Sequence, residues 1–118
     1  MADSLHVLAA AEEIEIGFVR PDGTRGSTPI WDVEVEDRIY VRSAGGTSGG
    51  WYRRLRANPD GEVRQGGRVY PVRAEPVHDA ELLSKVTSAY QVKYHGSSLL
   101  RMFSTQGAVA ATLRLVTR

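Results

Sequence analysis

The chain has 118 residues, no cysteine and a nearly even balance of 15 basic and 14 acidic residues. This length predicts a single domain over residues 1–118 with one modest core. A net charge of +1 argues against nucleic-acid binding, which requires a strongly basic face. The lack of cysteine excludes disulfides and thiolate metal sites.

Two further features narrow the class of protein. No apolar run approaches the roughly 18 residues of a membrane span, and polar residues interrupt the start of the chain where a signal peptide would be apolar. We therefore expect a cytoplasmic protein without a membrane span. The three histidines, His6, His78 and His95, lie far apart and lack the spacing of zinc ligands, so no metal site is expected.

The order of elements follows from hydrophobic periodicity and turn signals. Alternating apolar residues predict strands, and apolar residues three and four apart predict helices. Asp3 or Ser4 can cap the first helix and Asp79 the longest one. The expected elements are a helix over 5–11, strands over 12–19, 26–35 and 39–41, a helix over 51–57, strands over 62–65 and 68–75, helices over 80–94 and 99–103, and a strand over 109–117.

This order predicts a small, mainly β domain. Six strands with a few helices suit a mostly antiparallel barrel that has helices at its openings. The last strand must return to pair with an early one, because the sheet would otherwise keep exposed edges. On the strand over 26–35, Trp31, Val33 and Val35 share one face, while Ile30 and Asp32 lie on the other.

A glycine-rich loop over 43–50 precedes the aromatic and basic helix that starts at Trp51. Glycine leaves backbone amides uncovered, and a helix N-terminus attracts anions, so this segment can hold a phosphate or a carboxylate. Arg42, Arg53 and Arg54 are interpreted as surface charges that bind the same anion and add little to stability. The alternative is a mobile surface loop followed by a solvated basic helix.

Three strings of residues in this region resemble the deazaflavin-dependent nitroreductase family. They are S-x-G-G in the loop, W-Y-x-x-L-x-A-N-P over 51–59 and G-G-R-x-Y-P-V-R-A-E over 66–75. That family is a branch of the FMN-binding split β-barrels, and the chain as a whole is similar to a small bacterial family of unknown function inside the same superfamily. The resemblance implies a six-stranded antiparallel split β-barrel.

The resemblance also implies a cofactor, a partner and an activity. The cofactor would be a deazaflavin coenzyme of the F-420 type or FMN, held in a groove between the subunits of a homodimer. The activity would be an oxidoreductase reaction in which the cofactor passes hydride to a small electrophile.

Site residues follow from matching the chain to the family motifs. Ser43, Tyr90 and Tyr94 correspond to residues beside the substrate and are the candidate catalytic residues. A second phosphate motif falls on the turn after the first strand, where Pro21 and Asp22 replace the Lys-Ser pair of the family. The candidate cofactor-binding residues are Arg20, Arg25, Thr28, Arg42, Ser43, Gly45, Gly46, Trp51, Tyr52 and Arg54.

Several alternatives stay open at this level. The segment around Pro21 also fits a plain hairpin turn, and Trp51, Tyr52 and Tyr90 also fit core packing, with a partly exposed ring for Tyr94. Proline has no N–H to offer a phosphate and aspartate repels one. The replaced pair therefore motivates a second hypothesis, a non-catalytic split barrel that has lost its redox cofactor and holds another anionic ligand. A structural dimer without a ligand is the third.

Overall fold

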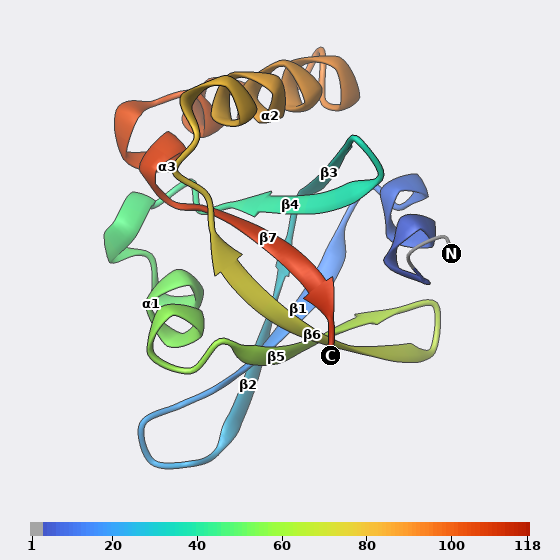
Figure 1. Ribbon diagram of the computed structural model, residues 1–118, viewed down its shortest axis with the longest axis vertical. Coiled ribbons are helices and arrows are strands. Elements are labelled where there is room, and N and C mark those ends of the chain that lie inside the picture. The colour runs from blue at the N-terminus through green and yellow to red at the C-terminus, as the bar shows by residue number, and fades with distance from the viewer. Residues whose placement is uncertain (1–3) are drawn as a thin grey trace.

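The computed structural model describes residues 4–118 and forms a seven-stranded sheet in which every strand pair is antiparallel (Figure 1). The strand order is β2-β1-β5-β6-β7-β4-β3. The strands are β1 (Ile14–Val19), β2 (Arg25–Ile30), β3 (Asp32–Val35), β4 (Arg38–Arg42), β5 (Asp60–Gln65), β6 (Arg68–Pro76) and β7 (Thr112–Thr117). As predicted, the last strand returns to an early one, because β7 pairs with β4.

The expected count of six strands is wrong, because the strand predicted over 26–35 is divided at Trp31. β2 before this residue pairs with β1, whereas β3 after it pairs with β4. The two halves are the opposite edges of the sheet, so the chain passes from one edge to the other within a single residue. The break also ends the expected alternation, since Asp32 and Val33 are both buried.

The helices lie around the sheet (Figure 1). They are the 3₁₀ helices η1 (Ser4–Ala10), η2 (Gly46–Ser48) and η3 (Leu100–Phe103) and the α-helices α1 (Gly50–Ala57), α2 (Ala80–Lys93) and α3 (Gln106–Ala110). The predicted cap of α2 is confirmed, because the Asp79 carboxylate accepts a hydrogen bond from the Leu82 amide at 2.8 Å. For the first helix, the alternative cap Asp3 lies outside the described residues. No helix in the described part of the chain has the length and apolar character that a bilayer crossing requires.

The last strand begins three residues later than the predicted start at Val109. Thr105 caps the short helix α3, with its hydroxyl accepting from the Ala108 amide at 3.1 Å. The apolar run over 109–111 therefore belongs to the end of this helix and the residue after it, and only the part from Thr112 onward pairs in the sheet.

The core consists of two clusters on opposite sides of the β3–β4 hairpin. The larger fills the interior of the curved sheet and is closed by Leu5 and Leu8 of η1 and Leu55 of α1. The smaller lies between the hairpin and α2, where Val86 and Tyr90 of the helix are buried. Helix α2 therefore packs outside the barrel on β3.

Candidate functional site

An apolar pocket of about 280 Å³ lies where the corner between β2 and β3 meets the end of β4 and the start of α1. We call it the tryptophan pocket, because it contains both tryptophans of the chain. Its apolar walls are Pro29, Ile30, Trp31, Trp51, Leu99, Met102 and Phe103, and Glu13, Arg42 and Ala44 complete the lining. A concave apolar surface with few polar groups is typical of a small-molecule site.

Trp31 is fixed by stacking against other aromatic rings. Its ring lies 4.0 Å from that of Tyr94, with 3° between the planes, and 4.8 Å from that of Phe103, with 16° between them. Aromatic pairs in such arrangements are stabilising beyond the area they bury. These contacts on the rings of Tyr94 and Phe103 hold the Trp31 side chain in the wall of the pocket.

Arg42 lines the pocket from below, although only 1% of the residue is exposed. Its donors bond to the hydroxyl of Thr112 (2.8 Å), the hydroxyl of Thr87 (2.7 Å), and the carbonyl oxygens of Phe103 and Leu83 (both 3.0 Å). The expectation that Arg42 is a surface charge is wrong.

All of these partners are neutral, and no carboxylate among residues 4–118 forms an ion pair with Arg42. Burial lowers the pKa of the guanidinium, but arginine keeps its charge in proteins. The tryptophan pocket thus has a fixed positive charge at its base, and this charge favours a ligand with negative or electron-rich atoms.

Part of the glycine loop packs against other residues of the chain rather than standing free for a ligand. Gly46 is buried with φ +72, and a Cβ there would lie 3.4 Å from the backbone of Gly107 in α3. Its amide donates to the Ser43 carbonyl at 3.0 Å, and the Gly49 amide donates to the Gly46 carbonyl at 3.1 Å. Gly45 is exposed, so the described structure favours Gly45 over Gly46 as the point where a ligand approaches.

The predicted catalytic residues are all buried, and the two tyrosines hold the backbone of the corner at Trp31. The Tyr90 hydroxyl donates to the Trp31 carbonyl at 3.1 Å, and the Tyr94 hydroxyl accepts from the Asp32 amide at 3.2 Å and donates to the Glu12 carbonyl at 2.7 Å. The alternative of a partly exposed ring for Tyr94 is wrong, since the residue is 4% exposed. Burial raises the pKa of both hydroxyls, and neither they nor Ser43 line the tryptophan pocket. The geometry therefore favours positioning roles for the tyrosines.

The second predicted phosphate motif lies in a separate, more polar groove of about 330 Å³, which we call the arginine groove. It is lined by Arg20, Arg25, Gly26, Ser27, Glu62 and Arg64. The Arg20 guanidinium donates to the Arg25 carbonyl at 2.7 Å, and Glu62 pairs with Arg64 at 3.2 Å and with Arg25 at 3.4 Å. Three cations face one carboxylate here, so the groove is positive overall.

The turn between β1 and β2 has the geometry of a plain hairpin turn. The Arg20 amide donates to the Thr24 carbonyl at 2.8 Å, and Gly23 has a φ of +87. The Asp22 carboxylate accepts from the amide and the hydroxyl of Thr24, at 3.0 and 2.6 Å. These hydrogen bonds lower the pKa of Asp22, so its negative charge is fixed at the tip of the hairpin.

The predicted cofactor-binding residues are therefore divided. Arg42 and Trp51 line the tryptophan pocket, whereas Arg20 and Arg25 line the arginine groove. Of the others, Tyr52 is buried in the core, and Thr28 and Arg54 are half-buried outside both sites.

Sequence reasoning missed a buried acid. Asp32 is 0% exposed, and one of its carboxylate oxygens bonds to the Lys93 ammonium at 3.0 Å while the other has no hydrogen-bond partner among the described residues. Burial raises the pKa of this carboxyl to about 6, and the Lys93 charge offsets only part of the effect. The residue was placed on the second face of a continuous strand, so only the break at Trp31 reveals its burial.

A family model described as "Uncharacterized protein conserved in bacteria (DUF2255)" matches residues 4–115. The chain belongs to this family. No curated protein matches the chain in sequence.

Solved structures identify the fold. A conserved hypothetical protein from Mycobacterium tuberculosis superposes with a TM-score of 0.71 at 17% identity, over 94% of this chain and 76% of that one. A structure titled F420-H2 dependent reductase gives 0.67 at 17% identity, over 89% and 93% of the two chains. An FAD-binding protein from Mesorhizobium loti gives 0.63 at 20% identity, over 95% and 83%. The predicted antiparallel split-barrel fold is thus confirmed, with seven strands rather than six.

Proposed function

We propose that this protein binds a flavin-type nucleotide, a deazaflavin coenzyme or FMN, with the ring in the tryptophan pocket. The observation that carries the proposal is the pairing of an apolar, aromatic-walled pocket with the buried charge of Arg42 at its base. A flavin-type ring is flat and apolar on its faces and has electron-rich oxygen and nitrogen atoms on one edge. Trp51 offers an aromatic face, and Arg42 offers the positive charge for that edge.

The arginine groove suits the phosphate of the same ligand. Strand β2 runs from Arg25, beside the groove, to Pro29, which lines the pocket. At about 3.4 Å per residue, these four steps span about 14 Å. This separation suits a ligand whose ring and phosphate are joined by an extended chain, and three arginines provide charge-assisted hydrogen bonds to phosphate.

The pocket is small for a whole nucleotide. Its volume of about 280 Å³ is at the lower end of the roughly 300–1,000 Å³ of ligand pockets. We therefore propose that a second copy of the chain completes the site, as the resemblance to dimeric split barrels implies. A cytoplasmic location is part of the same proposal.

Intrinsic fluorescence tests this proposal directly, because both tryptophans of the chain line the pocket. Titration with FMN and, separately, with the deazaflavin coenzyme should quench this fluorescence to saturation. We expect Trp51→Ala to weaken binding at least tenfold, and Val92→Ala on the exposed face of α2 to leave it unchanged. Binding that is unaffected by Trp51→Ala, or no binding of either ligand, would contradict the assignment.

The reaction class is a separate step of the proposal. A bound flavin-type cofactor supplies hydride transfer, while the chain orients the ring and excludes water from it. Reduced cofactor bound to the protein should then be reoxidised faster by an aromatic nitro compound than free cofactor is. Tight binding without this acceleration would favour the alternative function, a non-catalytic split barrel that holds a nucleotide or another anion.

A further inference from the structure

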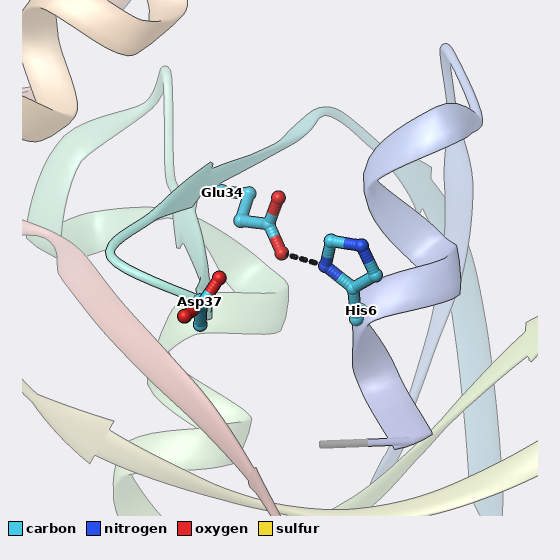
Figure 2. A group of neighbouring side chains, drawn as sticks. All are labelled: His6, Glu34 and Asp37. Atoms are coloured by element: carbon cyan, nitrogen blue, oxygen red, sulfur yellow. Dashed lines mark hydrogen bonds and ion pairs between the residues drawn. The ribbon is translucent and has the colours of Figure 1, made fainter. Parts of the chain in front are cut away.

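A second group of side chains lies on the opposite side of the β3–β4 hairpin from α2, and none of its members lines the tryptophan pocket. His6 comes from η1, Glu34 from β3 and Asp37 from the turn between β3 and β4 (Figure 2). One ligand atom of each residue lies within 4.8 Å of the other two. Figure 2 shows the imidazole and the Glu34 carboxylate pointing toward one another, with a hydrogen bond from the ring to the carboxylate.

The fold fixes where each of these side chains points. Leu5 and Leu8 are buried in the core, so His6 is turned outward, with its side chain 61% exposed. Val33 and Val35 are buried on one face of β3, which places Glu34 between them on the opposite face, toward η1.

Asp37 is brought to the same place by a tight two-residue turn. Glu36 and Asp37 have φ values of 52 and 65, and they are the only non-glycine residues with positive φ in the described part of the chain. Glu36 in this turn is directed elsewhere, because its carboxylate pairs with Lys85 of α2 at 3.5 Å. The turn therefore sends one acid to α2 and leaves the other with His6 and Glu34.

We propose that His6, Glu34 and Asp37 form a binding site for a divalent transition-metal ion such as Zn²⁺, Co²⁺ or Ni²⁺. An imidazole ligand favours these ions over Mg²⁺ and Ca²⁺, which prefer oxygen ligands only. Two carboxylates balance the charge of the ion. Metal–ligand distances of about 2.0–2.2 Å require ligand atoms closer together than 4.8 Å, and rotation of the exposed His6 and Asp37 side chains supplies that adjustment.

Three protein ligands leave the remaining coordination positions to water, since the site faces solvent. Binding would join η1 to the β3–β4 hairpin across the opening of the barrel, because His6 is on one and both acids are on the other. An ion that binds only the folded chain stabilises it by mass action. Metal addition should therefore raise the melting temperature, and the rise should depend on all three side chains.

The test combines thermal melts with visible spectroscopy of the Co²⁺-loaded protein. We expect the wild-type protein, freed of metal with a chelator and then titrated with Zn²⁺, to melt several degrees higher at saturation. Co²⁺ should give absorption bands whose intensity reports the coordination. His6→Asn and Asp37→Asn should each weaken Co²⁺ binding at least tenfold.

Matched controls come from the same chain. Glu36→Gln changes the other acid of the same turn, and His78→Asn with His95→Asn removes both remaining histidines. These variants should bind Co²⁺ like the wild-type protein. The proposal is overturned if 1 mM Co²⁺ or Zn²⁺ leaves the spectrum and the melting temperature unchanged, or if the histidine controls lose binding while His6→Asn keeps it. If His6→Asn does not fold, Asp37→Asn, on an exposed turn, gives the same comparison.

Discussion

At the scale of single residues, Arg42 joins four segments of the chain. Its guanidinium bonds to groups on α2, η3 and β7 from its own position at the end of β4. Arg42→Ala removes these hydrogen bonds and leaves a cavity, so the free energy of unfolding should fall by about 3 kcal/mol. Urea denaturation measures the change.

Arg53→Ala is the matched control, because Arg53 is exposed on α1. It should change the free energy of unfolding by no more than about 0.5 kcal/mol. Equal effects of the two substitutions would contradict the structural role of Arg42. A stability loss in Arg42→Ala alone would support that role. The sequence could not reveal it, because an arginine at the end of a strand has the same local pattern whether it faces solvent or the interior.

Asp32 gives stability a specific dependence on pH. The pKa of its carboxyl is about 6 in the folded chain and 3.8 in the reference state, so the folded chain holds the proton more tightly. The tighter proton binding by folded Asp32 therefore favours folding below about pH 4, and this contribution to stability is lost as the pH rises toward 6. Burial and the charge of Glu34 favour the neutral carboxyl, whereas Lys93 and a hydrogen bond from the Asp32 backbone favour its charged form.

Asp32→Asn removes the ionisation and keeps the side-chain volume. The free energy of unfolding of this variant, relative to wild type, should therefore rise by up to about 3 kcal/mol between pH 4 and pH 7. Urea denaturation at several pH values, with a chelator present, gives the comparison. A difference between the two proteins that stays constant with pH would show that folding does not raise the pKa of Asp32.

At the scale of elements, two adjacent residues of the glycine loop differ in whether they can accept a side chain. Gly46 needs its positive φ and its close contact with Gly107, whereas Gly45 has a φ of −78 and only ordinary contacts for an added Cβ. Gly46→Ala should cost roughly 1–3 kcal/mol of stability, because a side chain in the left-handed region is strained.

Gly45→Ala should fold with unchanged stability and should weaken binding of FMN or the deazaflavin coenzyme, if the ligand approaches the loop at this residue. Thermal melts and fluorescence titration separate the two effects. Weakened folding in Gly45→Ala, or normal stability in Gly46→Ala, would contradict this division of roles.

Local sequence patterns were sufficient for most elements, since alternation and caps act within a few residues. The helix after the glycine loop and the long helix capped by Asp79 follow from such patterns. The break at Trp31 does not, because the hydroxyls of Tyr90 in α2 and of Tyr94 directly after it bond to the backbone of the corner from about sixty residues away. The strand count failed at this point for that reason.

At the scale of the whole molecule, the fold decides which of the predicted site residues lie together. The sequence predicted Arg42 and Trp51 together, and both line the tryptophan pocket. It also joined Arg20 and Arg25 to that site, but Arg20 follows β1 and Arg25 begins β2, and both line the separate arginine groove. The cluster of His6, Glu34 and Asp37 was missed because its members come from separate elements and have no ligand spacing.

The rim of the tryptophan pocket provides a test of the proposed dimer. Leu99 and Met102 are 53% and 44% exposed there and lie together at one pocket, and a grouped apolar surface of this kind suits contact with a partner. We expect a homodimer in solution, and Leu99→Asp should shift it toward monomer because a charge would be buried in the interface. Analytical ultracentrifugation measures the shift, with Val92→Asp on α2 as a control at a more exposed apolar residue that should leave the mass unchanged.

Leu99→Asp also tests whether ligand binding depends on dimerisation. If a second copy completes the nucleotide site, Leu99→Asp should weaken FMN or deazaflavin binding in proportion to the loss of dimer, and raising the protein concentration should restore both. A monomeric variant that binds as tightly as wild type would separate dimerisation from the site. A wild-type chain that is monomeric at all concentrations would leave the pocket to act alone, and its volume would then limit the ligand to a ring-sized molecule.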